Sequence, residues 1–137
     1  MENPGNQLYK VRKILWLLAP LIGWIFAHVS FAIPVKRLRE TKTLMAFYHP
    51  KPSYPFHVLL VPKKAVVTLK DLDATDTFFL ADLYSTVQSL VDEFQLPAYR
   101  LILNGGEYQD FPQLHFHLIA EVAGNGDTSI ASARSAI

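Results

Sequence analysis

The chain has no cysteine, and this absence removes several kinds of chemistry at once. Without thiols there is no disulfide framework, no thiolate zinc site and no cysteine nucleophile. The chain is also short, because 137 residues give room for one domain rather than two. We therefore expect a single domain that is held together by its own hydrophobic core.

Charge is scarce as well. Thirteen Lys and Arg residues against twelve Asp and Glu leave a formal net charge of +1. No global positive field is available to hold phosphate backbones, so nucleic acid is not an expected partner. Only 18% of the residues are charged and 50% are hydrophobic, which excludes a disordered chain and exceeds the apolar content of an ordinary soluble domain.

The apolar excess is concentrated in the uncharged run Ile14–Ile33. Its length suits a transmembrane helix, and basic residues precede it, namely Lys10, Arg12 and Lys13. A secretory signal peptide cleaved after Ala32 fits the same pattern. A buried core helix is the third interpretation, which we disfavour because a chain this small could hardly surround an element that is apolar on every side.

These segments predict a division of the chain into three parts. Residues 1–32 form a membrane anchor or signal peptide, residues 33–122 form the folded domain, and the small, polar segment 123–137 forms a flexible tail. We expect a single-pass N-terminal anchor with the domain in the cytoplasm. The alternative is a secreted or periplasmic domain after signal cleavage.

The domain shows one helical and several strand patterns. Apolar residues recur every three or four positions from Thr75 to Gln95, with Thr75 or Asp76 able to cap the helix. The stretch RLRE and four apolar or alternating runs indicate strands, the runs being Leu44–Tyr48, Phe56–Val61, Tyr99–Asn104 and Gln113–Ala120. The pattern predicts an α+β fold, in which an antiparallel sheet of about five strands carries one long amphipathic helix and follows an N-terminal hydrophobic helix.

The segment QLHFHLI is the most informative stretch for chemistry. On a strand, Gln113, His115 and His117 would share one face. A solvated sheet face without a task would explain this pattern. So would a metal site, since His-x-His on a strand supplies two ligands and a third could come from His49, His57, Asp110 or Glu121.

Three segments together resemble the histidine triad family. They are AFYHPKPSYPFHVLLVPKKAV, RLILN and QLHFHLI, and the last is similar to the family signature His-φ-His-φ-His-φ-φ, where φ is apolar. A proline-rich loop followed by a His-containing strand that ends in Pro-Lys-Lys is typical of the nucleotide-binding branch. The resemblance extends from Ile33 to about Ile119, which is nearly the whole domain.

The resemblance implies a role for each matching residue. His115 matches the nucleophile, which attacks the α-phosphorus of a nucleotide derivative and forms a covalent nucleotidyl-histidine. His117 matches a contact to the α-phosphate, His57 a further active-site histidine, and Asn104 an Asn beside the phosphate. The reaction so implied, by a nucleotide hydrolase or nucleotidyl transferase, uses neither a metal nor a cofactor.

Three positions depart from the family pattern. Gln113 replaces the first His of the signature, although a backbone carbonyl there can still orient the nucleophile. His49 stands where many members have an Asp that binds the ribose hydroxyls, and Asp110 where several have a Ser that assists the leaving group. An enzyme and a catalytically impaired nucleotide-binding or interaction module of the same fold therefore both remain open.

The resemblance also implies a homodimer, joined across the helix and the strand that ends in RLILN. The run Tyr99–Asn104 is apolar enough to be buried on both faces, which agrees with this arrangement. The expected partners are thus a nucleotide or nucleoside phosphate derivative, a second copy of the chain, and a membrane through the N-terminal helix.

Overall fold

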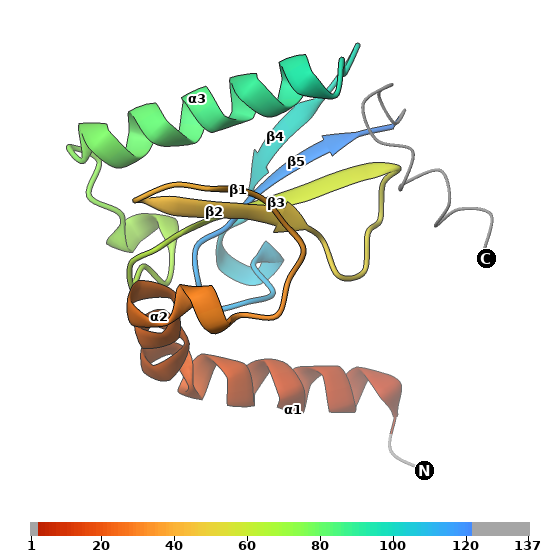
Figure 1. The fold of residues 1–137 in the computed structure, drawn as a ribbon. Helices are drawn as coiled ribbons and strands as arrows, with labels where there is room; N and C mark the ends of the chain where they lie inside the picture. The colour runs from red at the N-terminus through yellow and green to blue at the C-terminus, as the bar shows by residue number, and fades with distance from the viewer. Residues whose placement is uncertain (1–2, 122–137) are drawn as a thin grey trace.

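The computed structural model describes residues 3–121, and it forms an α+β fold with a five-stranded antiparallel sheet and three α-helices (Figure 1). The predicted tail 123–137 lies outside these residues. The strand order is β1-β2-β3-β5-β4. The elements are α1 (Pro4–Leu17), α2 (Ala19–His28), β1 (Arg37–Glu40), β2 (Leu44–Tyr48), β3 (Phe56–Pro62), α3 (Thr77–Glu93), β4 (Arg100–Leu103) and β5 (Phe116–Ala120). The predicted fold class is confirmed.

The strands follow the apolar runs closely at β2 and β3. The register runs from Leu44 opposite Pro62 to Tyr48 opposite Val58, and the proline-rich loop connects the two strands. The last predicted strand is shorter than expected and begins at Phe116 rather than Gln113. Ahead of it, the Leu114 N–H donates to the carbonyl of Val66, so this stretch pairs with an irregular segment instead of a strand.

Helix α3 covers one face of the sheet. Asp76 caps it, since its side chain accepts from the backbone N–H of Phe79 at 3.0 Å. Its buried stripe is Phe79, Leu83, Thr86, Val87 and Leu90. The apolar members of this stripe pack against side chains from β2, β3 and β5 that all point to this face, among them Ala46, Val58, Leu60 and Leu118. This layer contains most of the core.

Helix α2 lies on the opposite side of the sheet from α3 (Figure 1). Phe26 belongs to a second apolar cluster with Met45, Phe47 and Val61. The close approach requires a glycine, because a Cβ at Gly23 would lie 2.9 Å from the Cβ of Ala65. The run that we interpreted as an anchor therefore contributes one buried stripe to the domain core.

The predicted single N-terminal hydrophobic helix is wrong in one respect, because the structure has two helices there. The break is at Leu18, and the axes of α1 and α2 are bent by 58°. Pro20 lacks an N–H and its ring clashes with the preceding helical turn, which explains the break. Between residues 3 and 121 no single helix is long and apolar enough to cross a bilayer, whereas the bent pair together meets that test by length and composition. The anchor and the signal peptide stay predictions.

Candidate functional site

Four of the five histidines gather on the sheet face that α3 leaves uncovered. His57 on β3 and His117 on β5 are neighbours across the two strands, and Nε2 of His57 lies 2.9 Å from Nδ1 of His117. His49 follows β2 and stacks on His57, with ring centroids 4.3 Å apart. His115 immediately precedes β5, and its ring centroid lies 4.9 Å from that of His117. The fold thus brings together histidines that lie as far as 68 positions apart in the sequence, 117 − 49 being 68.

The protonation of His115 follows from its hydrogen bond. Nδ1 lies 2.7 Å from the main-chain oxygen of Gln113. A carbonyl oxygen can only accept, so Nδ1 must carry the proton. In the neutral ring, Nε2 then holds a lone pair. The imidazole of His115 is therefore oriented as a nucleophile or base through Nε2.

A chain of hydrogen bonds likewise fixes His57 and His117. The backbone N–H of Ser53 donates to Nδ1 of His57 at 3.2 Å, so a neutral His57 carries its proton on Nε2 and donates it to Nδ1 of His117. A neutral His117 must then carry its own proton on Nε2. This nitrogen is buried and has no hydrogen-bond partner among residues 3–121. The site thus contains an N–H donor without an acceptor.

The electrostatic environment keeps these rings neutral. Burial, reinforced by His49 and His117, lowers the pKa of His57 to about 4. Burial also lowers the pKa of His117 to about 4, with further lowering by His115 and His49 and an opposing effect of Asp110. The pKa of His49 is lowered as well, mainly by burial. Uncharged imidazoles are therefore the expected forms of these three residues at neutral pH.

His49 presents a second donor. Its Nδ1 accepts from the backbone N–H of Lys51 at 3.0 Å, so the proton of the neutral ring is on Nε2. Ser53 and Lys51 could not be found from the sequence, because each acts through a backbone amide. Only the fold of the proline-rich loop places these amides beside the rings.

Gln113 lies on the side of the sheet away from α3, because Leu114 and Phe116 both belong to the core beneath α3 and the Gln113 amide oxygen lies near Gly23 of α2. Its side chain is fully buried, and its amide donates to the carbonyls of Pro62 at 3.1 Å and Lys64 at 2.7 Å. Gln113 contributes its main-chain oxygen to the site and uses its side chain to hold the end of β3.

Asn104 and Asp110 lie at the margin of the cluster. The register places Leu103 opposite Phe116, so Asn104, the next residue, comes beside His115. Asp110 is exposed and close enough to His117 to raise its pKa. All seven residues that the sequence singled out therefore belong to one region of the fold.

No group of three His, Asp or Glu side chains that could hold a metal ion occurs within residues 3–121. The hydrogen bonds explain this result for the histidines. Both ring nitrogens of His57 are engaged, as is Nδ1 of His115, His117 and His49. The lone pairs therefore do not converge on one point, and the metal-site interpretation has no ligand set in this part of the chain.

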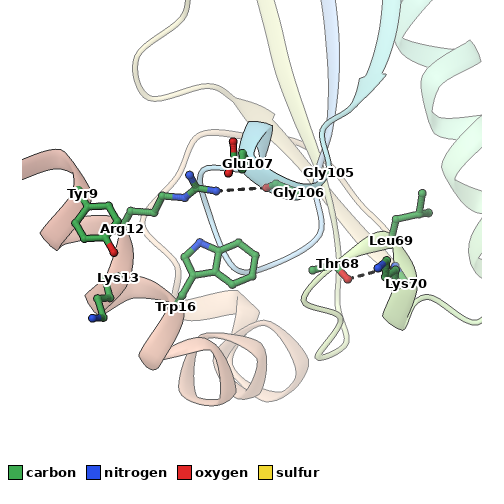
Figure 2. A pocket seen from close by; sticks show the side chains of 10 residues that line it. All are labelled: Tyr9, Arg12, Lys13, Trp16, Thr68, Leu69, Lys70, Gly105, Gly106 and Glu107. Atoms are coloured by element: carbon green, nitrogen blue, oxygen red, sulfur yellow. Dashed lines mark hydrogen bonds between the residues drawn. The ribbon is translucent and has the colours of Figure 1, made fainter. Parts of the chain in front are cut away.

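A separate cavity of about 690 Å³ lies between α1 and two short turns of the domain (Figure 2). Figure 2 shows Trp16 and Arg12 on one side of it and Leu69 on the other. The Arg12 guanidinium donates to the carbonyls of Gly106 and Gln109, both at 3.3 Å, and so fastens α1 to the loop after β4. None of the clustered histidines lines this cavity.

Known proteins share sequence with most of this chain. The HIT domain family matches residues 30–123. A HIT-like protein of Azospirillum brasilense, itself uncharacterized, is 36% identical over 102 residues, which span 70% of this chain and 84% of that protein. A Schizosaccharomyces pombe protein named bis(5'-nucleosyl)-tetraphosphatase is 35% identical over 96 residues, 66% of this chain but only 51% of that protein.

Solved structures show the same likeness. A histidine triad protein from Clostridium difficile superposes with a TM-score of 0.64 at 26% identity, covering 75% of this chain and 95% of that one. A HIT family hydrolase from Legionella pneumophila gives a TM-score of 0.63 at 26% identity, covering 72% and 91%. The chain therefore belongs to the HIT domain family, the histidine triad family that its motifs resemble.

Proposed function

We propose that this protein is a nucleotide hydrolase or nucleotidyl transferase that acts at the α-phosphate through a covalent intermediate on His115. The observation that carries the proposal is the hydrogen bond from Nδ1 of His115 to the main-chain oxygen of Gln113. This hydrogen bond leaves the Nε2 lone pair free to attack phosphorus. It requires only the main-chain oxygen of Gln113, so it does not depend on the histidine that the family signature has at this position.

The reaction proceeds in two displacements. The Nε2 lone pair of His115 forms a bond to the α-phosphorus, while the bond to the leaving group breaks and its electron pair departs with that group, which takes up a proton. Water, or an acceptor alcohol or phosphate, then attacks the same phosphorus and releases the nucleotide from His115. The Nε2–H of His117, which has no hydrogen-bond partner within residues 3–121, would donate to a phosphoryl oxygen, where negative charge develops.

The relatives support this substrate class. The Schizosaccharomyces pombe relative carries the name of a nucleotide tetraphosphatase, and a structural neighbour is called a hydrolase. We infer nucleotides or nucleoside phosphate derivatives as substrates of this chain from that kinship together with the neutral imidazole cluster. His49 presents an N–H donor, whereas many family members have an Asp at this position, so we expect altered recognition of the ribose hydroxyls.

A single-turnover reaction with adenosine 5'-phosphoramidate tests the proposal. We expect the adenylyl group on His115, detected by peptide mass spectrometry after acid-free quenching, and loss of both labelling and turnover in His115→Ala. Because His28 lies on α2, where its Nδ1 bonds the carbonyl of Trp24, His28→Ala is the matched control and should turn over normally. If His115→Ala is as fast as the parent protein, the nucleophile is assigned wrongly.

One observation favours the alternative of a binding module. The exposed carboxylate of Asp110 lies near His117, and an ionised carboxylate beside a phosphate repels it. Binding of AMP without turnover of the phosphoramidate, in both the parent protein and Asp110→Ser, would identify the chain as such a module. Turnover that appears or rises in Asp110→Ser would instead show that the carboxylate restrains an intact catalytic site.

We also propose that the protein is a homodimer. Strand β4 is at the edge of the sheet, next to β5 only, and its residues Leu101, Ile102 and Leu103 are partly exposed. An apolar edge strand is a ready surface for pairing with a second chain. Pairing there would extend the sheet across two copies.

A further inference from the structure

Large apolar side chains remain exposed along both N-terminal helices. Leu17 is 73% exposed, Trp24 is 52% exposed, and Phe31 in the following turn is 73% exposed. Five more large apolar side chains along α1 and the start of α2 are exposed, namely Leu8, Val11, Ile14, Leu18 and Leu21. Together with Leu17 they recur every one to three residues. We call these eight residues the apolar stripe. Exposed apolar side chains that gather on neighbouring helices in this way mark an interaction site.

The apolar stripe does not belong to the hydrophobic core, because other residues of the same helices make the contacts with the domain. Ala19, Gly23 and Phe26 are the buried residues of α2. Arg12 fastens α1 to the loop after β4 through two main-chain carbonyls. The helix pair is therefore held to the domain by one side, and the apolar stripe is left outside that contact.

The charges on the two N-terminal helices have one sign. From residue 3 to residue 28 the chain contains no Asp or Glu, but α1 carries Lys10, Arg12 and Lys13. The arginines of β1 are paired with acids, Arg37 with Glu40 and Arg39 with Glu93, so the argument rests on the cations of α1. Apolar side chains interspersed with cations suit the interface of a membrane that carries anionic lipids. A second copy of this chain on the same stripe would instead bring like charges together, which disfavours self-association through it.

We propose that α1 and α2 bind flat on the surface of an anionic membrane, with the apolar stripe inserted among the lipid headgroups and the catalytic domain held outside the bilayer. The 58° bend and the packing of α2 on the sheet favour this arrangement over crossing, because crossing would pull Phe26 out of its cluster with Met45 and Val61. Trp24 is a ring of the type that prefers the interface. This inference is independent of the proposed nucleotide chemistry.

Sedimentation of the full-length protein with vesicles tests the proposal. We expect binding to phosphatidylcholine vesicles that contain phosphatidylglycerol, about tenfold weaker binding to phosphatidylcholine alone, and weakening by salt.

Replacing Leu17 and Leu21 together by Glu should weaken binding by at least about tenfold. Lys13→Gln should weaken it about fivefold. The matched control is Gln88→Glu, which adds a negative charge at an exposed position on α3 across the sheet and should bind normally.

The depth of insertion separates surface binding from crossing. The chain has only two tryptophans, so comparison of the parent with Trp24→Phe isolates the fluorescence of Trp24. We expect quenching of Trp24 by lipids brominated near the headgroup and release of the bound protein by alkaline carbonate. Phosphoramidate turnover by the Leu17→Glu/Leu21→Glu variant verifies that it is folded if the parent turns over, and near-ultraviolet circular dichroism does so otherwise.

Several results would overturn the proposal. Resistance to alkaline carbonate would indicate a spanning anchor, and recovery of a chain that begins at Ile33 would indicate a cleaved signal peptide. Equal binding to vesicles with and without anionic lipid, or no binding to either, would contradict the charge argument. A dimer in lipid-free solution that the Leu17→Glu/Leu21→Glu variant abolishes would show that a second copy covers the apolar stripe.

Discussion

Gln113 connects two parts of the site at the scale of a single residue. Its main-chain oxygen sets the tautomer of His115, and its side-chain amide holds the carbonyls of Pro62 and Lys64 at the end of β3. The orienting group is therefore one that any residue at this position would supply. The side chain matters for stability rather than for the identity of the nucleophile.

We accordingly expect Gln113→Ala to keep most of its single-turnover rate but to unfold at a lower temperature. Two buried carbonyls lose their donors and a cavity forms, which together cost about 2–4 kcal/mol. Gln113→His should retain or raise the rate because it restores the family signature. Gln113→Glu is the sharper control, because it keeps the shape of the side chain but puts an acceptor oxygen, in place of the amide donor, against the two carbonyls. Equal melting temperatures of Gln113→Glu and the parent would contradict this account.

The pH dependence of stability follows from the two imidazoles whose pKa falls to about 4, those of His57 and His117. The pKa of His57 and of His117 is about 4 in the fold, against a usual value of 6.5. Between these values the unfolded chain binds more protons than the folded one, so the free energy of unfolding falls as the pH is lowered from 6.5 toward 4. His57 alone should contribute on the order of 2 kcal/mol to this fall.

Thermal melts across this pH range measure the effect. We expect His57→Asn to melt with a shallower dependence on pH than the parent, because one depressed imidazole is gone. His28→Asn should keep the parent's dependence, since its ring lies on α2 and bonds only within that helix. A slope unchanged in His57→Asn would show that other groups set the acid limit.

At the scale of elements, the attachment of α2 depends on one close contact. A Cβ at Gly23 would lie 2.9 Å from the Cβ and 3.2 Å from the Cα of Ala65, and neither atom can swing away. Helix propensity favours Ala over Gly by about 1 kcal/mol, but the clash should exceed this gain. The contact also lies near Gln113, whose Oε1 would be 3.8 Å from the same Cβ.

We therefore expect Gly23→Ala to lower the free energy of unfolding by about 1–3 kcal/mol in denaturant titrations. Gly23→Ala combined with Ala65→Gly should recover most of the loss. Gly5→Ala is the matched control in α1, where the new Cβ would meet only Asn3 Oδ1 at 3.7 Å, and its stability should be unchanged or slightly raised. A Gly23→Ala protein as stable as the parent would mean that α2 is not held by this contact.

At the scale of the whole molecule, sedimentation velocity tests the homodimer. We expect the protein in detergent to sediment as a dimer at micromolar concentration, because β4 offers an apolar edge and α3 next to it exposes Phe78 and Tyr84. Replacing Leu101 by Arg should shift the mass toward the monomer, whereas Leu69→Arg, at an exposed position before α3, should not. A monomeric parent protein would contradict the proposal.

The sequence by itself determined the fold class, the positions of β2, β3 and α3, and a set of polar residues that the fold brings into one region. Period-two runs bounded by prolines and a three-to-four period of apolar residues are local signals, which is why they could be interpreted without the fold. The order and spacing of the motifs around His57, Asn104 and His115 likewise survive in the linear chain.

Only the tertiary structure decided how these residues work. The tautomers of His57 and His49 depend on backbone amides of the loop that carries Ser53, and backbone amides leave no trace in a residue pattern. The packing of Gly23 on Ala65 depends on a contact between segments 42 residues apart, 65 − 23 being 42. A uniformly apolar run has no periodicity that distinguishes a buried side from an exposed one, so its burial is decided by the surface it meets in the fold.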